Sequence, residues 1–135
     1  MKEKLINLLN NSYSPYSKFR VACIVVMKDG KEFSGVNVEN SSYGATICAE
    51  RSAIVGAISN GYKKYDFDKL YVMCDSHKIS TCCMICRQVI LEFFEKDKEV
   101  ICFNNLGDSK KFLVSDLCPY PFDSEDLIWN VDLLV

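Results

Sequence analysis

The chain has a single histidine, no excess of positive charge and no long apolar run. Its 16 basic and 18 acidic residues give a net charge of −2, which argues against a nucleic-acid partner because nucleic-acid binders usually present a basic face. No apolar run approaches the roughly 20 residues that a membrane helix requires. The N-terminal stretch MKEKLINLLNN is amphipathic and lacks the features of a signal peptide. We therefore expect a cytoplasmic protein with no nucleic-acid and no membrane partner.

Internal repeats, low-complexity tracts and linker-like segments are also missing. The 135 residues are enough for one domain with one core, and 49% hydrophobic and 25% charged residues are ordinary for a globular protein. We predict a single domain over residues 1–135.

Cysteine, by contrast, is abundant, with eight residues in the chain. Since a signal peptide is not expected, a reducing compartment is, and the cysteines should be thiols or metal ligands and not disulfides. Cys23, Cys74 and Cys102 lie in apolar, strand-like runs, where a cysteine is usually a small buried hydrophobe. We expect the same of Cys118, whereas Cys82 is ambiguous because another cysteine follows it directly.

Two short motifs carry most of the chemical information, Cys48-Ala49-Glu50-Arg51 and Cys83-Met84-Ile85-Cys86-Arg87-Gln88. Together they offer three thiolates and one carboxylate. Three protein ligands, an open position and a nearby proton carrier are the components of a catalytic zinc site. The two motifs therefore predict a zinc ion held by Cys48, Cys83 and Cys86, with Glu50 beside it.

A lone Cys-x-x-Cys can also be redox-active or form half of a structural zinc site. A structural site usually has four protein ligands. The one histidine, His77, lies in a predicted loop and is expected to be solvated. Cys82 is a poor fourth ligand, because two adjacent cysteines do not easily occupy one tetrahedral site. Three ligands and an open position are therefore the preferred interpretation.

Each motif stands at the start of a predicted helix. Residues 86–94 have apolar side chains at helical spacing, and residues 51–59 form a similar run. Both helices would aim their N-termini at the metal, and a helix N-terminus stabilises anions and lowers thiol pKa values. Three thiolates overcompensate the charge of one zinc ion, so we expect Arg51 and the helix ends to draw off part of that negative charge.

The rest of the pattern predicts one mixed sheet. A helix is predicted at residues 1–11 and strands at residues 19–27, 32–38, 70–75, 100–103 and 111–114, with an Asp-Gly turn between the first two strands. This order implies an α/β fold, a three-layer α/β/α sandwich with a mixed five-stranded sheet. Only seven residues, Asn104 to Lys110, separate the last two strands. They cannot hold a crossover helix, so these two strands should be antiparallel.

Further segments accompany the two motifs in a characteristic order, namely Tyr16–Val21, Gly35–Gly44 and Pro119–Phe122. With them, the chain resembles the small homotetrameric cytidine deaminases of the cytidine/deoxycytidylate deaminase superfamily over nearly its whole length. Zinc deaminases include a variant with three cysteine ligands, and their catalytic glutamate is not a ligand. Antiparallel last strands also fit this family.

The resemblance implies roles at the metal. Cys48, Cys83 and Cys86 would hold one zinc ion per subunit, and Glu50 would shuttle protons. Arg51 would donate hydrogen bonds to the zinc thiolates.

The resemblance also implies the contacts with a nucleoside substrate. Phe19 would pack against the nucleoside, and the backbone of Ala49 would contact the pyrimidine edge. Asn37 and Glu39 would hydrogen-bond the ribose, chiefly its 3′-hydroxyl. Phe122 would cap the base from a neighbouring subunit of a homotetramer.

The implied activity is hydrolytic deamination of cytidine and deoxycytidine in pyrimidine salvage. A related nucleoside such as blasticidin S is an alternative substrate, and a catalytically silent zinc-binding subunit is a third hypothesis that the intact Glu50 disfavours. The family usually has Pro before and Gly after the first cysteine of its Cys-x-x-Cys motif, which corresponds to Cys83. This chain has Cys82 and Met84 at those two positions. We expect these departures to affect pocket shape and metal affinity more than the reaction.

Overall fold

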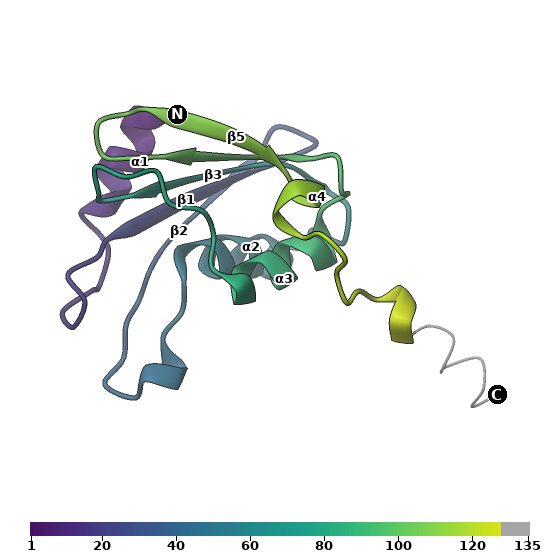
Figure 1. Ribbon diagram of the computed structural model, residues 1–135, viewed down its shortest axis with the longest axis horizontal. Helices are drawn as coiled ribbons and strands as arrows, with labels where there is room; N and C mark the ends of the chain where they lie inside the picture. The colour runs from purple at the N-terminus through teal and green to yellow at the C-terminus, as the bar shows by residue number, and fades with distance from the viewer. Residues whose placement is uncertain (128–135) are drawn as a thin grey trace.

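The computed structural model describes residues 1–127 as a five-stranded sheet with helices packed against it (Figure 1). The strands are β1 (Val21–Met27), β2 (Glu32–Val36), β3 (Phe67–Cys74), β4 (Glu99–Phe103) and β5 (Ser109–Leu113). The helices are α1 (Lys2–Leu9), α2 (Ala49–Ser59), α3 (Met84–Phe93) and α4 (Val114–Leu117), with a 3₁₀ turn η1 (Tyr43–Ala45).

The strands follow the order β2-β1-β3-β4-β5, and the sheet is mixed, as predicted. β3 and β4 are parallel, with α3 between them in the chain, whereas the other neighbouring strands are antiparallel. The antiparallel arrangement of β4 and β5 also agrees with the short connection between them. None of the helices in residues 1–127 combines the length and apolar character that a membrane crossing requires.

Alternation along β1 explains why helices cover both faces of the sheet. Cys23 and Val25 belong to the larger buried cluster, which includes residues of α2 and α3. Ala22 and Ile24 point the other way, into a smaller cluster with residues of α1. Successive side chains of a strand point to opposite faces, so this apolar strand buries both of its faces. Figure 1 accordingly shows α1 apart from α2 and α3.

The predicted boundaries differ from the observed ones where tertiary pairing takes over. The strand predicted over residues 32–38 ends at Val36, because Val38 leaves it to form isolated bridges with Tyr13 and Ile47. β3 starts at Phe67, earlier than predicted, since Phe67 pairs with Met27 beyond an irregularity in the ladder.

Two expectations concern the C-terminal part of the chain. The structure adds the helix α4, which was not predicted because its four residues are too few for a visible periodicity. Beyond residue 114 the sequence pattern predicts an irregular C-terminus, of which residues 128–135 lie outside the described part of the chain.

One glycine sets the distance between β2 and α2. A Cβ atom at Gly35 would lie 2.5 Å from the carbonyl oxygen of Ala49 and 2.5 Å from the amide nitrogen of Ala53. Real Cβ atoms do not approach backbone atoms so closely, so only glycine allows this contact. The contact fixes the first turn of α2, which carries part of the candidate site.

We predict that Gly35→Ala lowers the free energy of unfolding by about 1–3 kcal/mol, because the added methyl group must push α2 off the sheet. Thermal and denaturant unfolding would measure the change. Gly56→Ala is the matched control. A Cβ at Gly56 has nothing within 4 Å, and alanine is the better helix former, so this variant should be at least as stable as the parent. Equal unfolding midpoints for Gly35→Ala and the parent would contradict the prediction.

Candidate functional site

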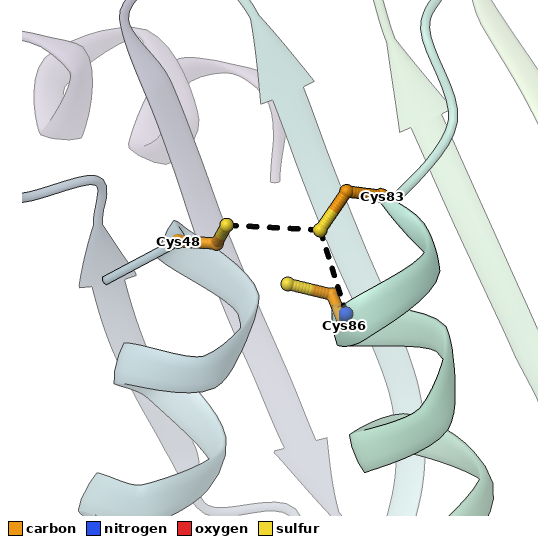
Figure 2. Close-up of side chains that lie close together, drawn as sticks. All are labelled: Cys48, Cys83 and Cys86. Carbon is orange, nitrogen blue, oxygen red and sulfur yellow. Dashed lines mark hydrogen bonds between the residues drawn. The ribbon is translucent and has the colours of Figure 1, made fainter. Parts of the chain in front are cut away.

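Three thiols meet where the N-termini of α2 and α3 converge (Figure 2). Cys48 is the N-cap residue of α2 and Cys83 is the N-cap residue of α3. Cys86 lies in the first turn of α3, and its amide nitrogen donates to Cys83 Sγ at 3.4 Å. Because both N-cap residues are extended and not helical, their side chains turn back over the helix ends, toward one another.

The three sulfur atoms have the spacing of a tetrahedral metal site. They all lie within 4.8 Å of one another, and Cys48 Sγ is 3.7 Å from Cys83 Sγ. Zinc–sulfur bonds of about 2.3 Å at tetrahedral angles separate two sulfur ligands by about 3.8 Å, so the Cys48–Cys83 distance matches that of two zinc ligands. Within residues 1–127, this is the one group of three or more potential ligands that comes together.

Arg51 and the thiols themselves stabilise negative charge on Cys48. Hydrogen bonds from the Cys86 thiol and from Arg51 lower the pKa of the Cys48 thiol to about 5. The guanidinium Nη2 of Arg51 is 3.4 Å from Cys48 Sγ. The pKa of Cys86 is raised in turn, because its thiol donates to Cys48 and is buried. The metal-free cluster therefore holds its first negative charge on Cys48.

Glu50 lies in the first turn of α2, between these ligands and the core. Its side chain is buried with 4% exposure, and that burial raises the pKa of its carboxyl group. Glu50 is not part of the cluster of potential ligands. A buried carboxyl group with a raised pKa can accept and donate protons near neutral pH.

A cavity of about 350 Å³ opens in front of the thiols and the carboxylate. Its walls combine the start of β1, the residues after β2, the N-terminus of α2 and the end of β3: Ser17, Phe19, Val21, Asn37, Glu39, Thr46, Cys48, Ala49, Glu50, Val72, Cys74, Ser80, Thr81 and Cys83. A hollow of similar size between α3 and residues 123–125 contains none of the predicted site residues.

Asn37 and Glu39 hold the N-terminal loop against this cavity. The Asn37 side chain accepts from the amide of Val21 at 3.0 Å and donates to the carbonyl of Phe19 at 2.8 Å. Glu39 Oε1 accepts from the amides of Tyr16 and Ser17 at 3.0 and 3.1 Å.

Glu39 also keeps its charge. Hydrogen bonds to its carboxylate, the strongest from the Ser17 hydroxyl, lower the pKa of Glu39. The carboxylate is therefore an ionised acceptor at the rim of the cavity.

The predicted site residues lie close together with one exception. Phe19, Asn37, Glu39, Ala49 and Glu50 all line the cavity, beside the thiol ligands. Phe122 does not line the cavity of its own chain. Its carbonyl oxygen accepts from Gln88 Nε2 at 2.8 Å, while its side chain is 60% exposed.

The other cysteines follow the expected pattern in most respects. Cys23, Cys74 and Cys102 are buried, whereas Cys118 is only half-buried. Cys82 packs into the core and is not in the metal cluster, and His77 is exposed, so neither offers a fourth ligand.

Sequence reasoning missed several walls of the cavity. Val72 and Cys74 line it from β3, and their spacing of two along a predicted strand was a usable signal, because it places both on one face. Ser17, Ser80 and Thr81 line it from loops, where no periodicity could have identified them.

Comparison with known proteins assigns the chain to a family. The profile described as "Cytidine and deoxycytidylate deaminase zinc-binding region" matches residues 1–104. A protein of Halalkalibacterium halodurans named cytidine deaminase is 38% identical over 93% of both chains. A probable cytidine deaminase of Dictyostelium discoideum is 44% identical over 93% of this chain and 86% of its own. The chain therefore belongs to the cytidine and deoxycytidylate deaminase family.

Solved structures agree with that assignment. The crystal structure of cytidine deaminase from Burkholderia pseudomallei superimposes with a TM-score of 0.85 at 38% identity, over 89% of this chain and 94% of that one. The enzyme from Mycobacterium tuberculosis gives a TM-score of 0.76 at 28% identity, over 90% and 94% of the two chains.

We predict that the low pKa of Cys48 is visible in its reactivity. In metal-free protein, alkylation of Cys48 by iodoacetamide should have a midpoint near pH 5, because the thiolate is the nucleophile and forms as pH rises through the pKa. A free cysteine has a midpoint of about 8.5. Peptide mass spectrometry would follow the labelling, and Arg51→Gln should move the midpoint upward.

Two controls accompany this measurement. Zinc should protect Cys48 from alkylation, and the buried Cys102 should stay unlabelled at every pH at which the protein is folded. A Cys48 midpoint near that of a free cysteine would refute the assigned interaction with Arg51 and Cys86.

Proposed function

We propose that this chain catalyses the hydrolytic deamination of cytidine and deoxycytidine to uridine and deoxyuridine, with release of ammonia, and serves pyrimidine salvage in the cytoplasm. The observation that carries the proposal is a buried Glu50 beside three converging thiols at a cavity of about 350 Å³. That volume suits a small-molecule ligand. Relatives named cytidine deaminase, 36–44% identical over most of this chain, support the same reaction.

Cys48, Cys83 and Cys86 would hold one zinc ion per chain. A zinc ion with three protein ligands and an open position is a Lewis acid that lowers the pKa of a bound water toward 7. Arg51 would draw charge from the cluster through its hydrogen bond to Cys48. A less negative ligand set leaves the metal more acidic, which favours this role.

Glu50 would carry the protons of the reaction. It would take one proton from the attacking water and deliver it to ring N3. It would then take the remaining proton of the new C4 hydroxyl group and deliver it to the amino group, so that the C4 carbonyl forms as ammonia leaves. Burial raises its pKa toward the working pH, where a group can both accept and donate. A positioned acid–base group of this type contributes about 10²–10⁴-fold to the rate.

Asn37 and Glu39 would recognise one hydroxyl group of the sugar, chiefly the 3′-hydroxyl. Glu39 offers an ionised acceptor, and Asn37 keeps one amide hydrogen beyond the one it gives to Phe19. A hydroxyl group can donate to the first and accept from the second at once. Phe19 would pack against the nucleoside, and the backbone of Ala49 would contact the pyrimidine edge.

The complete site would require a homotetramer with D₂ symmetry, in which each chain is one domain over residues 1–135. Phe122 is exposed and lies outside its own cavity, which leaves it free to cap the base in a neighbouring subunit. Met84 and Ile85 are also exposed, at 70% and 63%, beside Cys83. A second copy of the chain would cover such apolar side chains.

A substrate panel followed by ultraviolet absorbance tests the proposed reaction. We expect turnover of cytidine and deoxycytidine and very poor turnover of free cytosine, because the polar groups assigned to the sugar, the buried Asn37 among them, would lose their partner. Glu50→Gln should keep one zinc per chain while losing about 10²–10⁴-fold in kcat. Cys83→Ala should lose the zinc as well.

Each alternative gives a different result in that panel. Turnover of blasticidin S without turnover of cytidine would show that the substrate is a related nucleoside and not cytidine. A protein that binds zinc but turns over no compound of the panel would be a catalytically silent subunit. Loss of zinc from Glu50→Gln would make Glu50 a ligand or a structural support of the site. An active, metal-free parent protein would refute the zinc assignment.

Subunit mixing tests the shared site. Phe122→Ala should weaken cytidine binding roughly 5- to 150-fold, the effect of losing one base-stacking aromatic, without loss of zinc. Mixing it with an excess of Glu50→Gln subunits should restore activity, because those subunits supply Phe122 to intact catalytic groups.

The matched control is the double variant Glu50→Gln/Phe122→Ala, which should restore nothing on mixing. Subunit exchange would be verified by native mass spectrometry. No gain of activity after verified exchange, or full activity of a diluted monomer, would show that each site is complete within one chain.

A further inference from the structure

The Asn37 side chain has almost no hydrogen-bonding capacity to spare. Its Oδ1 accepts from the amide of Val21 at 3.0 Å and from the hydroxyl of Ser12, which uses both lone pairs. Its Nδ2 donates one hydrogen to the carbonyl of Phe19 at 2.8 Å. Within residues 1–127, these bonds leave one N–H as the group that Asn37 can offer to a ligand in the cavity.

Backbone pairing brings Ser12 next to the side chain of Asn37. The segment around Tyr13 runs alongside the residues after β2 as an isolated parallel bridge to Val38. Two hydrogen bonds hold it, from the Tyr13 amide to the Asn37 carbonyl at 3.0 Å and from the Glu39 amide to the Tyr13 carbonyl at 2.8 Å. The Ser12 side chain is therefore held against the Asn37 amide by backbone structure and does not depend on its own rotamer alone.

Ser14 completes a short chain of hydroxyl groups. Its Oγ lies 3.1 Å from Ser12 Oγ. A serine hydroxyl has one hydrogen, and Asn37 Oδ1 can only accept, so the hydrogen of Ser12 goes to Asn37. Ser14 must then donate to Ser12. Such chains polarise their members and strengthen the terminal bond, here the bond to Asn37.

We infer that Ser12 is a positioning residue for sugar recognition, and that Ser14 acts through it. This inference rests on the proposed function, since it assigns a task to the same cavity. The Val21 amide can only donate and the Phe19 carbonyl can only accept, so together they set which end of the Asn37 amide is Oδ1. The Ser12 hydroxyl adds a second donor to Oδ1 and holds the amide in that orientation. The observed orientation keeps the free N–H available to the sugar hydroxyl, with Glu39 as the facing acceptor.

Kinetics with two substrates tests this inference. Ser12→Ala should raise KM for cytidine roughly 2- to 10-fold, the worth of one neutral hydrogen bond, with kcat within about twofold. The preference for cytidine over 3′-deoxycytidine, measured as the ratio of kcat/KM values, should narrow by the same factor. Ser12→Thr keeps the hydroxyl group and should retain most of the preference.

A double-mutant cycle separates the two serines. Ser14→Ala alone should have a smaller effect in the same direction, and Ser12→Ala/Ser14→Ala should be no worse than Ser12→Ala, because Ser14 acts only through Ser12. Ser34→Ala, an exposed serine on β2, is the control and should match the parent. A lower thermal midpoint with an unchanged substrate preference in Ser12→Ala would overturn the inference in favour of a merely structural role.

A second readout does not depend on activity. The Asn37 side-chain amide can be assigned in ¹⁵N spectra by its loss in Asn37→Asp, and its hydrogen exchange should be at least threefold faster in Ser12→Ala than in the parent or in Ser34→Ala. Unchanged exchange would overturn the positioning role, whatever the substrate. If the parent did not turn over cytidine but the exchange effect held, the proposed function would fail while the fixed Asn37 amide stood.

Discussion

The convergence of two helix N-termini is the constraint on which the rest of this molecule depends. Cys48 and Cys83 are N-cap residues, and Cys86 follows one turn later, so three thiols face one another only if α2 and α3 keep their relative position (Figure 2). The central strands β1 and β3 carry both helices on one face through a shared apolar cluster. Gly35 lets β2 touch the first turn of α2, backbone to backbone. A metal site with bond lengths near 2.3 Å tolerates little displacement of this frame.

Two ionisable groups at the start of α2, Cys48 and Glu50, have pKa values shifted in opposite directions. Cys48, the N-cap, accepts hydrogen bonds from Arg51 and Cys86 and holds negative charge, so it suits a metal. Glu50, two residues later, is buried in the wall of the cavity, and that burial favours its protonated form. Only Ala49 separates the two groups in the sequence, yet their environments favour opposite charge states, an ionised thiolate at Cys48 and a neutral carboxyl group at Glu50.

The substrate side of the cavity is built from loops that polar side chains hold in place. Residues 12–19 form no regular strand or helix beyond one isolated bridge to Val38. The side chains of Asn37 and Glu39 accept hydrogen bonds from the backbone amides of Val21, Tyr16 and Ser17. These bonds replace the backbone pairing that a β-strand would have at this position. The same two side chains face the cavity. The hydrogen bonds that order the loop therefore limit which donors and acceptors of these two side chains are left for a ligand in the cavity.

Most of the elements could be predicted from local sequence patterns: periodicity predicted the helices α2 and α3, the Asp-Gly turn predicted the hairpin, and the short connection predicted antiparallel last strands. The two motifs singled out Cys48, Cys83 and Cys86, and helical spacing, which is a local property, accounts for the proximity of Cys83 and Cys86. Other facts became visible only in the folded chain. Cys82 packs into the core, whereas its neighbour Cys83 lies with Cys48 and Cys86. Cys74 is buried and also lines the cavity, and the Ser12 hydroxyl donates a hydrogen bond to Asn37. The tertiary structure also decided that Phe122 lies outside its own cavity. The physical reason is that these facts depend on which surfaces meet across the sheet, and local spacing carries no information about contacts between residues far apart in the chain.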